Sequence, residues 1–531
     1  MMKNCALLLL LLMAALQPAC AVTFDETTRY SKVVMNSRLS DFYANTKQTG
    51  FDVYDANGTK VKSSAKPGNL GLDYVLGLVG KAVLEAADYY SGKDDEAAKG
   101  WYRTLENYGN AFYATVPTSG GSLDDLNATK IYTLLYELSR GKFAGVANAA
   151  TTSNALSAMQ NAAKGLKAHD KTYSIAASTL SDAAGGWFHK SGYVNQLWLD
   201  GQYMGPALLA QLVTLNTLNG GTPVVKVDFQ EPWKVIMNQF DITWRYLWND
   251  ETGLLYHAFS ATPTASTSEA AWGQAGVYHS QEYWGRAEGW YFLALIDVME
   301  QMQLAGMTGS ADYATLRTYL NKMAAGLAAK QDAQTGCWYQ LLNYDASFAA
   351  DTYKGKKYNS VNNYIESSAT AIFIASYLKG QRLGMFDTDY TAVAKKAYKG
   401  FVEQFIVDDG NGGVHLIGSC RSAGLCGGNK RDGSAAYYLL GPDVTRVTAE
   451  MKQTEGKVLG AFILAAVEYE RLVDATALAC VYNNKEREAT KKYLAQNKVL
   501  IETPHGAYSA EGRKSPTPSL PKGRALNSLI R

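Results

Sequence analysis

The chain has 531 residues, and its 51 Lys and Arg residues nearly balance 49 Asp and Glu residues, for a formal net charge of +2. Because there is no basic excess, coating of a nucleic acid is excluded as its role. The length fits one large domain or up to about three smaller ones, and a hydrophobic content of 47% supports a large core. Tyr is frequent, with 35 residues against 16 Phe and 10 Trp. Rings with hydroxyl groups suit a sugar-binding groove, although large cores also contain many tyrosines.

The N-terminus has the residue order of a secretory signal. Lys3 precedes an apolar run over residues 6–16, and the small residues up to Ala21 fit cleavage after that position. Cys20 keeps a second interpretation open, in which this cysteine is lipidated and anchors the protein. The run is too short to span a membrane, and no later stretch is apolar enough to do so. We therefore expect residues 1–21 to be the signal peptide of an exported protein, periplasmic or secreted, with no membrane span.

Four cysteines follow the predicted signal, at Cys337, Cys420, Cys426 and Cys480. Cys420 and Cys426 stand in a glycine-rich stretch, close enough in sequence for a small disulfide ring in an oxidising compartment. Free buried thiols are the equally open alternative. No Cys-x-x-Cys pair or His/Cys cluster occurs, so the sequence indicates no metal site.

Apolar residues recur three and four positions apart in twelve segments, which predicts an all-α protein with twelve amphipathic helices. Strand-like stretches are few and lie between these segments. The predicted helices cover residues 30–46, 72–90, 94–114, 124–140, 152–167, 200–217, 230–247, 283–303, 310–329, 362–380, 388–406 and 455–473.

A weak internal repeat occurs in three of the loops between these helices. Residues 185–189, 253–257 and 336–340 each begin with Gly and end with an aromatic residue followed by His or Gln. The separation fits one helical hairpin plus its loops, so we expect stacked hairpins in a ring or solenoid. In a ring, the polar ends of the repeats would face one mouth. Chance recurrence is the alternative.

The composition changes after the last predicted helix. Residues 474–531 lose the helical period beyond one charged stretch and end in a segment rich in Pro and Ser. We expect a barrel or solenoid domain over residues 22–473 and a poorly ordered tail after it.

Three clusters of polar and aromatic residues are candidates for chemistry. His189-Lys190 precedes Trp198, and Asp200 follows at the start of an apolar segment, where it caps the helix or serves as an active-site acid. A second pair of acids, Asp124 and Asp125, also begins a predicted helix, which is an ordinary capping position.

The third cluster surrounds Arg286. On a helix this arginine lies beside Trp290, which is four residues further on, and Trp284 precedes it. The planar guanidinium group could therefore extend along these aromatic rings and bind a carboxylate. A buried ion pair between Arg286 and Glu288 or an aspartate, holding helices together, is the alternative.

Together these clusters resemble glycoside hydrolase family 105, the unsaturated rhamnogalacturonyl hydrolases, which are related to the unsaturated glucuronyl hydrolases. The stretch Trp198-Leu199-Asp200-Gly201-Gln202-Tyr203-Met204, preceded by His189-Lys190, is similar to the family's Trp-Leu-Asp-Gly-Leu-Tyr-Met signature. The resemblance covers roughly residues 30–473 and implies an (α/α)6 barrel of six helical hairpins. Further motifs occur in the family's order at residues 123–127, 283–290, 366–370, 431–434 and 437–438.

The resemblance also implies roles for individual residues. Asp200 is expected to be the catalytic proton donor and Asp124 the second acid, with Asp125 in its place if the register differs by one residue. Arg286 is expected to pair with a uronate carboxylate. The other expected substrate-binding residues are Tyr74, Trp198, Trp284 and Trp290 as stacking walls, His189, Lys190 and His257 as hydrogen-bonding groups, and Ser368.

The family's reaction differs from ordinary glycoside hydrolysis by two carboxylates. A lyase product ends in a 4,5-unsaturated uronic acid; an acid protonates C4, water adds at C5, and the hemiketal collapses with loss of the attached sugar. By resemblance no metal or organic cofactor is required, and the partner is an unsaturated oligosaccharide. We expect burial beside Trp198 and repulsion from Asp124 to raise the pKa of Asp200 and keep it neutral.

The sequence leaves alternatives open. Unsaturated galacturonate released from rhamnogalacturonan is the expected product, but an unsaturated glucuronyl hydrolase, another (α/α) barrel enzyme or a non-catalytic exported glycan-binding protein fits the same residues. The leaving sugar and the oligomeric state are not specified.

Overall fold

The computed structural model describes residues 21–483, apart from 46, 221, 264–271, 274–275 and 426–430, and three strands between residues 491 and 509. Its contacts divide the chain into one unit that ends at Glu468 and a second that begins at Tyr469. Residues 1–20 lie outside the described residues, so the signal peptide and the lipidation of Cys20 remain predictions. In the described part, no helix is long and apolar enough to cross a bilayer.

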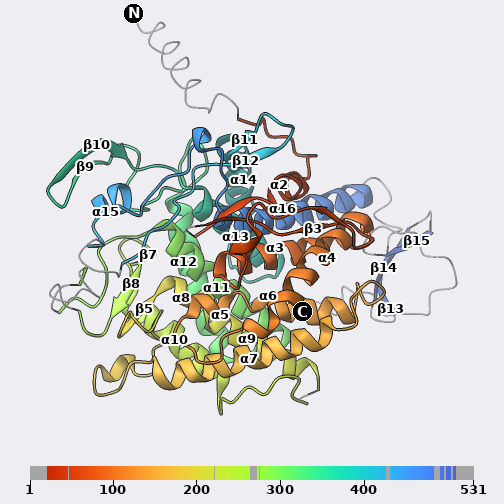
Figure 1. Cartoon of the computed structure of the whole chain (residues 1–531), viewed down its shortest axis with the longest axis horizontal. Helices are drawn as coiled ribbons and strands as arrows, with labels where there is room; N and C mark the ends of the chain where they lie inside the picture. Colours follow the sequence, from red (N-terminus) through yellow and green to blue (C-terminus); the bar gives the residue numbers. More distant parts are fainter. Residues whose placement is uncertain are drawn as a thin grey trace, which may run out of the picture. The chain divides into compact units, whose positions relative to one another are not determined.

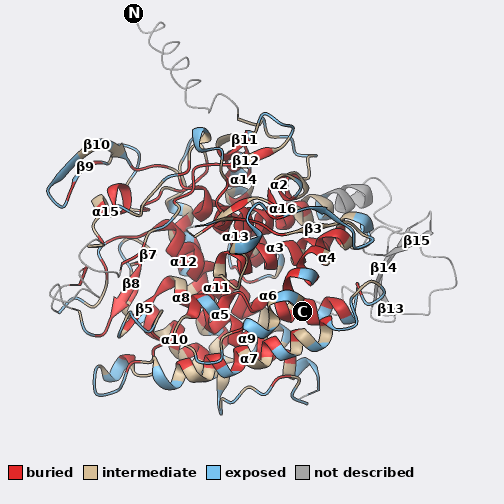
Figure 2. Cartoon of the chain, in the orientation of Figure 1, coloured by how far each residue is buried: buried red, intermediate tan, exposed pale blue. Residues whose placement is uncertain are grey.

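Six helices form the inner layer of the first unit (Figure 2). Most of their residues within this unit are buried. In α11 (Gly285–Leu304), every residue as far as Met299 is buried. A helix that is apolar on all sides is stable only inside a protein. The other inner helices are α3 (Tyr74–Tyr90), α6 (Lys130–Arg140), α9 (Pro206–Leu218), α13 (Ser367–Arg382) and α16 (Gly456–Asn483).

Six further helices around this layer bury mainly one face. In α12 (Ala311–Ala329), Leu316, Leu320, Met323 and Leu327 are buried, and their spacing of three and four residues gives the helix one apolar stripe. The other outer helices are α2 (Tyr30–Arg38), α4 (Asp95–Phe112), α7 (Thr151–Thr172), α10 (Pro232–Leu247) and α14 (Thr391–Phe405).

Inner and outer helices alternate along the chain, and consecutive helices pack as hairpins: α3 on α4, α6 on α7, α9 on α10, α11 on α12 and α13 on α14 (Figure 1). Inner neighbours touch in chain order from α3 to α13. The last inner helix closes the ring, because Glu468 of α16 accepts a 2.7 Å bond from Arg382 of α13 and Gly460 lies against Leu78 of α3. The predicted all-α (α/α)6 barrel is confirmed.

Two predicted helices are each divided in the structure. The segment predicted as 124–140 comprises α5 (Leu123–Asn127) and α6, and the segment 200–217 comprises α8 (Leu199–Met204) and α9. The second break falls at Pro206, which lacks an N–H and therefore fits only the first turn of a helix. Each break leaves a short helix at one end of an inner helix, and these short helices carry the two candidate acids.

The predicted repeat corresponds to a shared turn that follows three outer helices. Gly185, Gly253 and Gly336 have φ values of +77°, +69° and +74°, the left-handed region that glycine tolerates best. Each turn reverses the chain so that the residues after it run back toward an inner helix. The polar residues that end the three patterns are buried.

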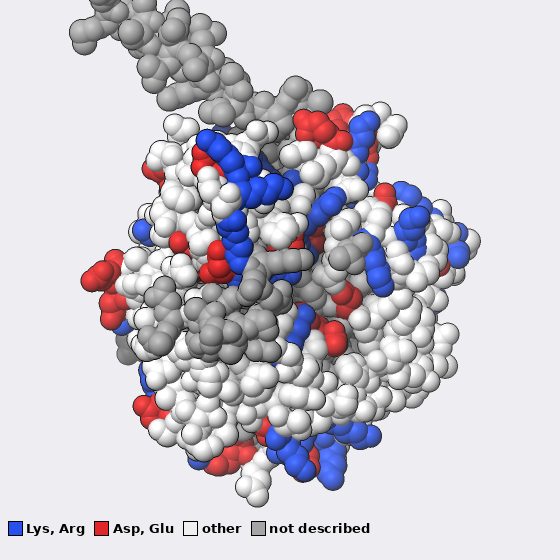
Figure 3. Space-filling model, turned by 60° about the vertical axis from the view of Figure 1, so that its left-hand side comes forward, with Lys and Arg blue, Asp and Glu red and all other residues white. Residues whose placement is uncertain are grey.

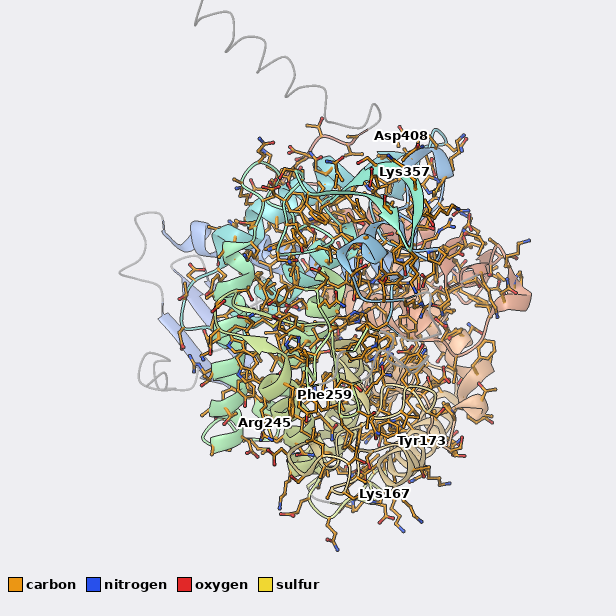
Figure 4. All side chains as sticks on the ribbon, turned by 90° about the vertical axis from the view of Figure 1, so that its left-hand side faces the viewer. Lys167, Tyr173, Arg245, Phe259, Lys357 and Asp408 are labelled. Carbon is orange, nitrogen blue, oxygen red and sulfur yellow. The ribbon has the colours of Figure 1, made fainter. Side chains whose placement is uncertain are left out.

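A pair of short strands connects two of these loops. β5 (Gln196–Trp198) pairs antiparallel with β8 (Ala258–Ser260), and Figure 4 labels Phe259 in the middle of β8. Asp200 follows β5 and His257 precedes β8, so the pairing brings these two side chains together although they lie on different hairpins.

A second hairpin, outside the helical layers, consists of β9 (Ala349–Tyr353) and β10 (Lys356–Asn362). It projects at the upper left in Figure 1 and packs against α15 (Ala435–Leu440). Lys357 lies on this hairpin and is labelled in Figure 4. Basic and acidic side chains are interspersed on the face shown in Figure 3, as the near-zero net charge implies.

The C-terminal part contains a helix and strands beyond residue 473, while the order of this part stays a prediction. Helix α16 continues to Asn483, past the predicted boundary at residue 473. The second unit contains a three-stranded antiparallel sheet of β13 (Lys491–Ala495), β14 (Lys498–Thr503) and β15 (Gly506–Ser509). The expectation of a tail without regular structure weighed only the helical period and missed strand-forming residues such as Val499 and Ile501.

Gly326 in α12 tests how tightly the barrel holds the turn at Gly253. A Cβ atom at residue 326 would stand 1.8 Å from the Gly253 carbonyl oxygen, and backbone atoms cannot rotate away. Gly326→Ala is therefore expected to lower the free energy of unfolding in urea by about 1–3 kcal/mol. Gly309→Ala, with no atom within 4 Å of the new Cβ, is the matched control. Equal stability of the two variants would contradict this packing.

Candidate active site

One cavity of about 370 Å³ opens among the N-terminal ends of α3, α5 and α8. Of the residues predicted for the site, six line it: Tyr74, Asp124, His189, Lys190, Trp198 and Asp200. The rest of its lining consists of Asn45, Asp73, Asp125, Tyr193, Met204, Ser422, Ala423, Gly424 and Arg431.

Asp124 is held by the loop that precedes β5. A backbone bridge joins Ser122 to Lys190, which places the first turn of α5 beside that loop. One carboxylate oxygen of Asp124 lies 3.3 Å from His189 Nε2 and the other 2.6 Å from Lys190 Nζ. The capping interpretation does not hold for this residue, because Ser122 caps α5 by accepting the N–H of Asp125.

These contacts fix the charge of Asp124. Burial raises the pKa of its carboxyl group, but His189 and Lys190 outweigh burial and hold the pKa well below the usual value. The same pairing raises the pKa of Lys190 against the effect of its own burial. For Asp125, burial and the neighbouring Asp124 charge both raise the pKa. Asp124 is therefore the ionised partner of two basic groups, and Asp125 is the acid that stands more exposed at the same wall.

Asp200 does not cap its helix either. Asp200 lies in the first turn of α8, and its carboxylate is 3.2 Å from Nε2 of His257. The His257 side chain is fully buried. The other ring nitrogen, Nδ1, lies 2.6 Å from the hydroxyl of Tyr438 on α15. Tyr438, His257 and Asp200 thus form a chain of hydrogen bonds that ends at the cavity.

The pKa of Asp200 moves opposite to the expectation. Burial raises it, as predicted, and the charge of Asp124 adds to that effect. The hydrogen bond from His257, together with the electrostatic effects of the His257 and His189 rings, outweighs both and leaves the pKa below the usual value. The sequence interpretation was wrong on this point, because His257 comes from the next hairpin and its contact with Asp200 arises only through the β5–β8 pairing.

An aromatic stack forms one wall of the cavity. The Trp198 indole is stacked on the Tyr193 ring, with centroids 4.7 Å apart, and on the His189 imidazole, with centroids 5.0 Å apart. The indole Nε1 donates to Gln196, which fixes the ring orientation. A flat aromatic face of this kind suits the apolar face of a sugar ring.

Arg286 lies behind the cavity rather than in its lining. Its Nη1 donates to the carbonyl oxygen of Cys420 and, at 3.2 Å, to Ser368 Oγ. Glu366 accepts the N–H of Cys420 at 2.7 Å and lies 3.8 Å from the guanidinium. The pair therefore clamps both polar groups of Cys420 and positions the wall formed by residues 422–424. Arg286 is not part of the cavity lining, and its expected contact with substrate stays a prediction.

Besides Arg286 and His257, three further predicted residues are absent from the cavity lining. Trp284 is buried, donates its Nε1 to Gln340 at 3.1 Å, and packs against the His257 ring. Trp290 is stacked on Tyr203, with centroids 5.0 Å apart, in the barrel core. Ser368 is buried against Glu366 in the Cys420 clamp. Trp284 therefore supports the site from behind, Trp290 and Ser368 have packing contacts away from the lining, and the expected substrate contacts of all three stay predictions.

Sequence reasoning missed several residues of the site. Asp73 caps α3 by accepting the N–H of Val75, and its pKa is raised mainly by burial. Arg431 pairs with Asp443 at 2.6 Å; its motif was recognised, but no role was assigned to it. A capping signal identified Asp73 only as the start of a helix, because its place at the cavity depends on the neighbouring hairpin.

The cysteines bear only on the surroundings of the site. Cys337 and Cys420 are buried with free thiols, and burial raises the pKa of both. Cys426, the predicted partner of Cys420, lies outside the described residues.

Arg286→Lys separates a clamping role from substrate contact. Lysine keeps the charge but loses the fork, so one bond to Cys420 or Ser368 is lost, at about 1.5–3 kcal/mol for a charged hydrogen bond. We expect a lower Tm together with a reduced kcat, because the wall at residues 422–424 shifts. Arg317→Lys, in an exposed pair with Asp387, is the control. A raised KM at unchanged Tm would indicate direct substrate contact instead.

Comparison with known proteins identifies the family to which this barrel is similar. The family model for Glycosyl Hydrolase Family 88 matches residues 52–473. Protein Atu3128 of Agrobacterium fabrum is 30% identical over 202 residues, which cover 37% of this chain and 76% of that protein.

Solved structures extend the similarity to nearly the whole barrel. A family 105 glycoside hydrolase of C. acetobutylicum ATCC 824 is 27% identical with a TM-score of 0.60, over 84% of this chain and 100% of that one. A possible family 105 member from Salmonella enterica shares the fold, with 19% identity and a TM-score of 0.55 over 86% of this chain and 97% of that one. The resemblance to family 105 is thereby confirmed, and the chain belongs to glycosyl hydrolase family 88 and is a glycoside hydrolase.

Proposed function

We propose that this protein is an exported hydrolase that removes 4,5-unsaturated galacturonic acid from the non-reducing end of the products of a rhamnogalacturonan lyase. The observation that carries the proposal is the meeting of Asp124 and Asp200 in one cavity, beside an aromatic wall and two cations. Export rests on the signal-like N-terminus, and the substrate class rests on the family resemblance and on the charges of the cavity.

In the proposed reaction, Asp200 gives a proton to C4 of the unsaturated ring. Water then adds at C5, and the Asp200 carboxylate left by the first step accepts a proton from that water. The hemiketal formed at C5 collapses, and the sugar attached at C1 leaves. Asp124, kept ionised by His189 and Lys190, holds these basic side chains in place and orients ring hydroxyl groups.

The uronate carboxylate needs a cationic partner. Among the described residues that line the cavity, Lys190 and Arg431 are the cationic ones, apart from histidine. Each of these cations has an acid partner at 2.6 Å, Asp124 for Lys190 and Asp443 for Arg431, but Asp124 belongs to the cavity lining and Asp443 does not. The Arg431 guanidinium lies beside Gly424 at the wall, with its Nη1 2.9 Å from the place of a Cβ on that glycine. Arg431 is therefore the residue proposed to receive the carboxylate, in the role that the sequence analysis gave to Arg286.

The same charges disfavour sulfated substrates. The four carboxylates of Asp73, Asp124, Asp125 and Asp200 outnumber the two cations of the lining. A sulfate ester would add further negative charge to this acidic cavity, whereas one uronate finds a partner. An unsulfated pectic disaccharide thus fits better than the product of a glycosaminoglycan lyase.

A panel of unsaturated disaccharides tests the proposed substrate. We expect loss of the enoate ultraviolet absorbance and release of reducing sugar with unsaturated galacturonyl-rhamnose. Sulfated unsaturated glucuronyl disaccharides are expected to be turned over at least tenfold more slowly. Equal or faster turnover of the sulfated compounds would overturn the assignment and favour the glucuronyl alternative.

Asp200→Asn tests the proton donor. The substitution is nearly isosteric but cannot donate a carboxylic proton, so kcat is expected to fall by about 10²–10⁴-fold, with substrate binding still detectable by calorimetry. Turnover close to that of the unmodified protein would exclude Asp200 from this role.

The pH dependence follows from the charge of Asp200. A protonated Asp200 is required at C4, so turnover falls as the pH rises through its pKa, which lies below the ordinary value in the free protein. A bound uronate adds a negative charge and raises that pKa. Because kcat reports the complex and kcat/KM the free protein, the alkaline limb of kcat should lie at the higher pH. The reverse order of the two limbs would argue against this scheme.

Arg431→Gln tests the carboxylate partner. Loss of a charge-assisted hydrogen bond, at about 1.5–3 kcal/mol, predicts a KM raised at least tenfold. Arg317→Gln removes a comparable arginine from an exposed pair on α12 and is expected to leave KM unchanged. An unchanged KM in Arg431→Gln would show that another residue binds the uronate carboxylate.

A further inference from the structure

The hydroxyl of Tyr438 and the carboxylate of Asp200 contact opposite nitrogens of one buried imidazole. The distances are 2.6 Å from Tyr438 to Nδ1 of His257 and 3.2 Å from Nε2 to Asp200. His257 and Tyr438 are both fully buried, and their rings pack together with Trp284. This geometry leaves His257 few ways to place its ring proton.

Tyr438 and Asp200, at the two ends of this series of hydrogen bonds, favour the same tautomer of His257. Burial raises the pKa of Tyr438 well above its usual value, so the phenol keeps its proton and acts as a donor. Among the described residues, the hydrogen-bond partner of this hydroxyl is Nδ1 of His257. Burial lowers the pKa of His257, so the ring is neutral near pH 7 and carries one proton. With Nδ1 accepting from Tyr438, that proton lies on Nε2 and points at Asp200.

The opposite tautomer would be unfavourable twice. A proton on Nδ1 would leave the buried Tyr438 hydroxyl hydrogen without an acceptor, and an unprotonated Nε2 would direct its lone pair at the Asp200 carboxylate. A buried unsatisfied donor alone costs about 1–3 kcal/mol. We propose that Tyr438 is a positioning residue that fixes the His257 tautomer, and that His257 Nε2–H thereby stabilises the ionised form of Asp200.

This inference rests on the proposed role of Asp200 and adds a function for the hydrogen-bonded pair of Tyr438 and His257 behind it, which we call the relay. The N–H stabilises the carboxylate that remains once the proton has moved to carbon, so it makes Asp200 a stronger acid. It also orients that carboxylate toward the water that attacks next. Gln340, the end of the third repeat, holds the relay from behind by donating to the Tyr438 carbonyl oxygen at 3.2 Å and accepting from Trp284.

Other titratable groups face the same three side chains and set the baseline for any pH measurement. His189 and Asp124 act on Asp200, and His189 and Arg286 act on His257. Tyr438 is faced by Tyr437, Glu282, Asp200 and Asp432.

Tyr438→Phe is the central test. Without the phenolic donor the tautomer is no longer fixed, and the ionised form of Asp200 loses its stabilisation. We expect the maximal kcat, reached below the alkaline limb, to fall about tenfold or more with little change in KM, because Asp200 becomes a weaker acid. The alkaline limb of kcat should move to higher pH, because the pKa of Asp200 rises. Tyr377→Phe removes a hydroxyl of the same kind, which donates at 2.6 Å to Ala324 in the barrel, and should leave both features unchanged.

Rescue distinguishes positioning from general loss of structure. A glutamine at position 257 donates from an amide that needs no partner to set its tautomer, so in a His257→Gln background Tyr438→Phe should have no further effect on the pH limb. The positioning role would be overturned if the losses of kcat in the His257→Gln, Tyr438→Phe double variant were additive. It would also be overturned if Tyr438→Phe alone lowered kcat without moving the alkaline limb of its pH profile.

A measurement without substrate keeps this inference separate from the proposed activity. Nitrogen-15 NMR of protein labelled in its six histidines, assigned with His257→Gln, reports which nitrogen of His257 carries the proton. We expect protonated Nε2 and unprotonated Nδ1 in the unmodified protein, and a loss of that preference in Tyr438→Phe. A proton on Nδ1, or a spectrum that Tyr438→Phe does not alter, would refute the proposal even if the enzyme hydrolyses the expected disaccharide.

Discussion

The pairing of β5 with β8 is the contact on which the site depends. These two short strands join neighbouring hairpins of the barrel and set Asp200, which follows one strand, against His257, which precedes the other. The loop before β5 also carries His189 and Lys190, which hold Asp124. A barrel of helices supplies rigid supports, but it is this strand pair and its loop that bring the acids into one cavity.

The charge balance around that pairing assigns different work to the two acids. Asp124 is neutralised by two basic side chains and stays ionised, so it serves best as an anchor. For Asp200, His257 and His189 lower the pKa of the carboxyl group and outweigh burial and Asp124, which raise it, and an incoming uronate would add to the raising effect. Of these two acids, we therefore propose Asp200 as the one that gains a proton when substrate arrives. Arg286 has buried partners in the Cys420 carbonyl oxygen and Glu366, so we propose a clamping role for it rather than a substrate contact.

Local pattern was sufficient to predict most of the fold. Twelve helices followed from apolar spacing because each helix buries a stripe or a whole surface, and this periodicity is a property of neighbouring residues. The breaks that create α5 and α8 were missed, although Pro206 marked one of them. The strands after Asn483 were missed because only helical spacing was weighed there.

The site was predictable only as far as residue types allow. Motifs identified Asp124, Asp200 and their basic neighbours, but the direction of the Asp200 pKa depends on His257, 57 positions away. Arg286 looked like a free fork in sequence, and its true partners lie 82 and 134 positions away in Ser368 and the Cys420 carbonyl. Such long-range partners leave no local signal.

The protonation state of Asp200 is the quantity that tests this account most directly. Carbon-13 NMR of labelled aspartate carboxyl groups, assigned with Asp200→Asn, gives the pKa of Asp200 in the free protein and in complex with a saturated uronic-acid disaccharide that cannot react. We predict a pKa below that of an ordinary aspartate in the free protein and a higher pKa in the complex. A free-protein pKa above the ordinary value, or one that the bound uronate leaves unchanged, would contradict this prediction.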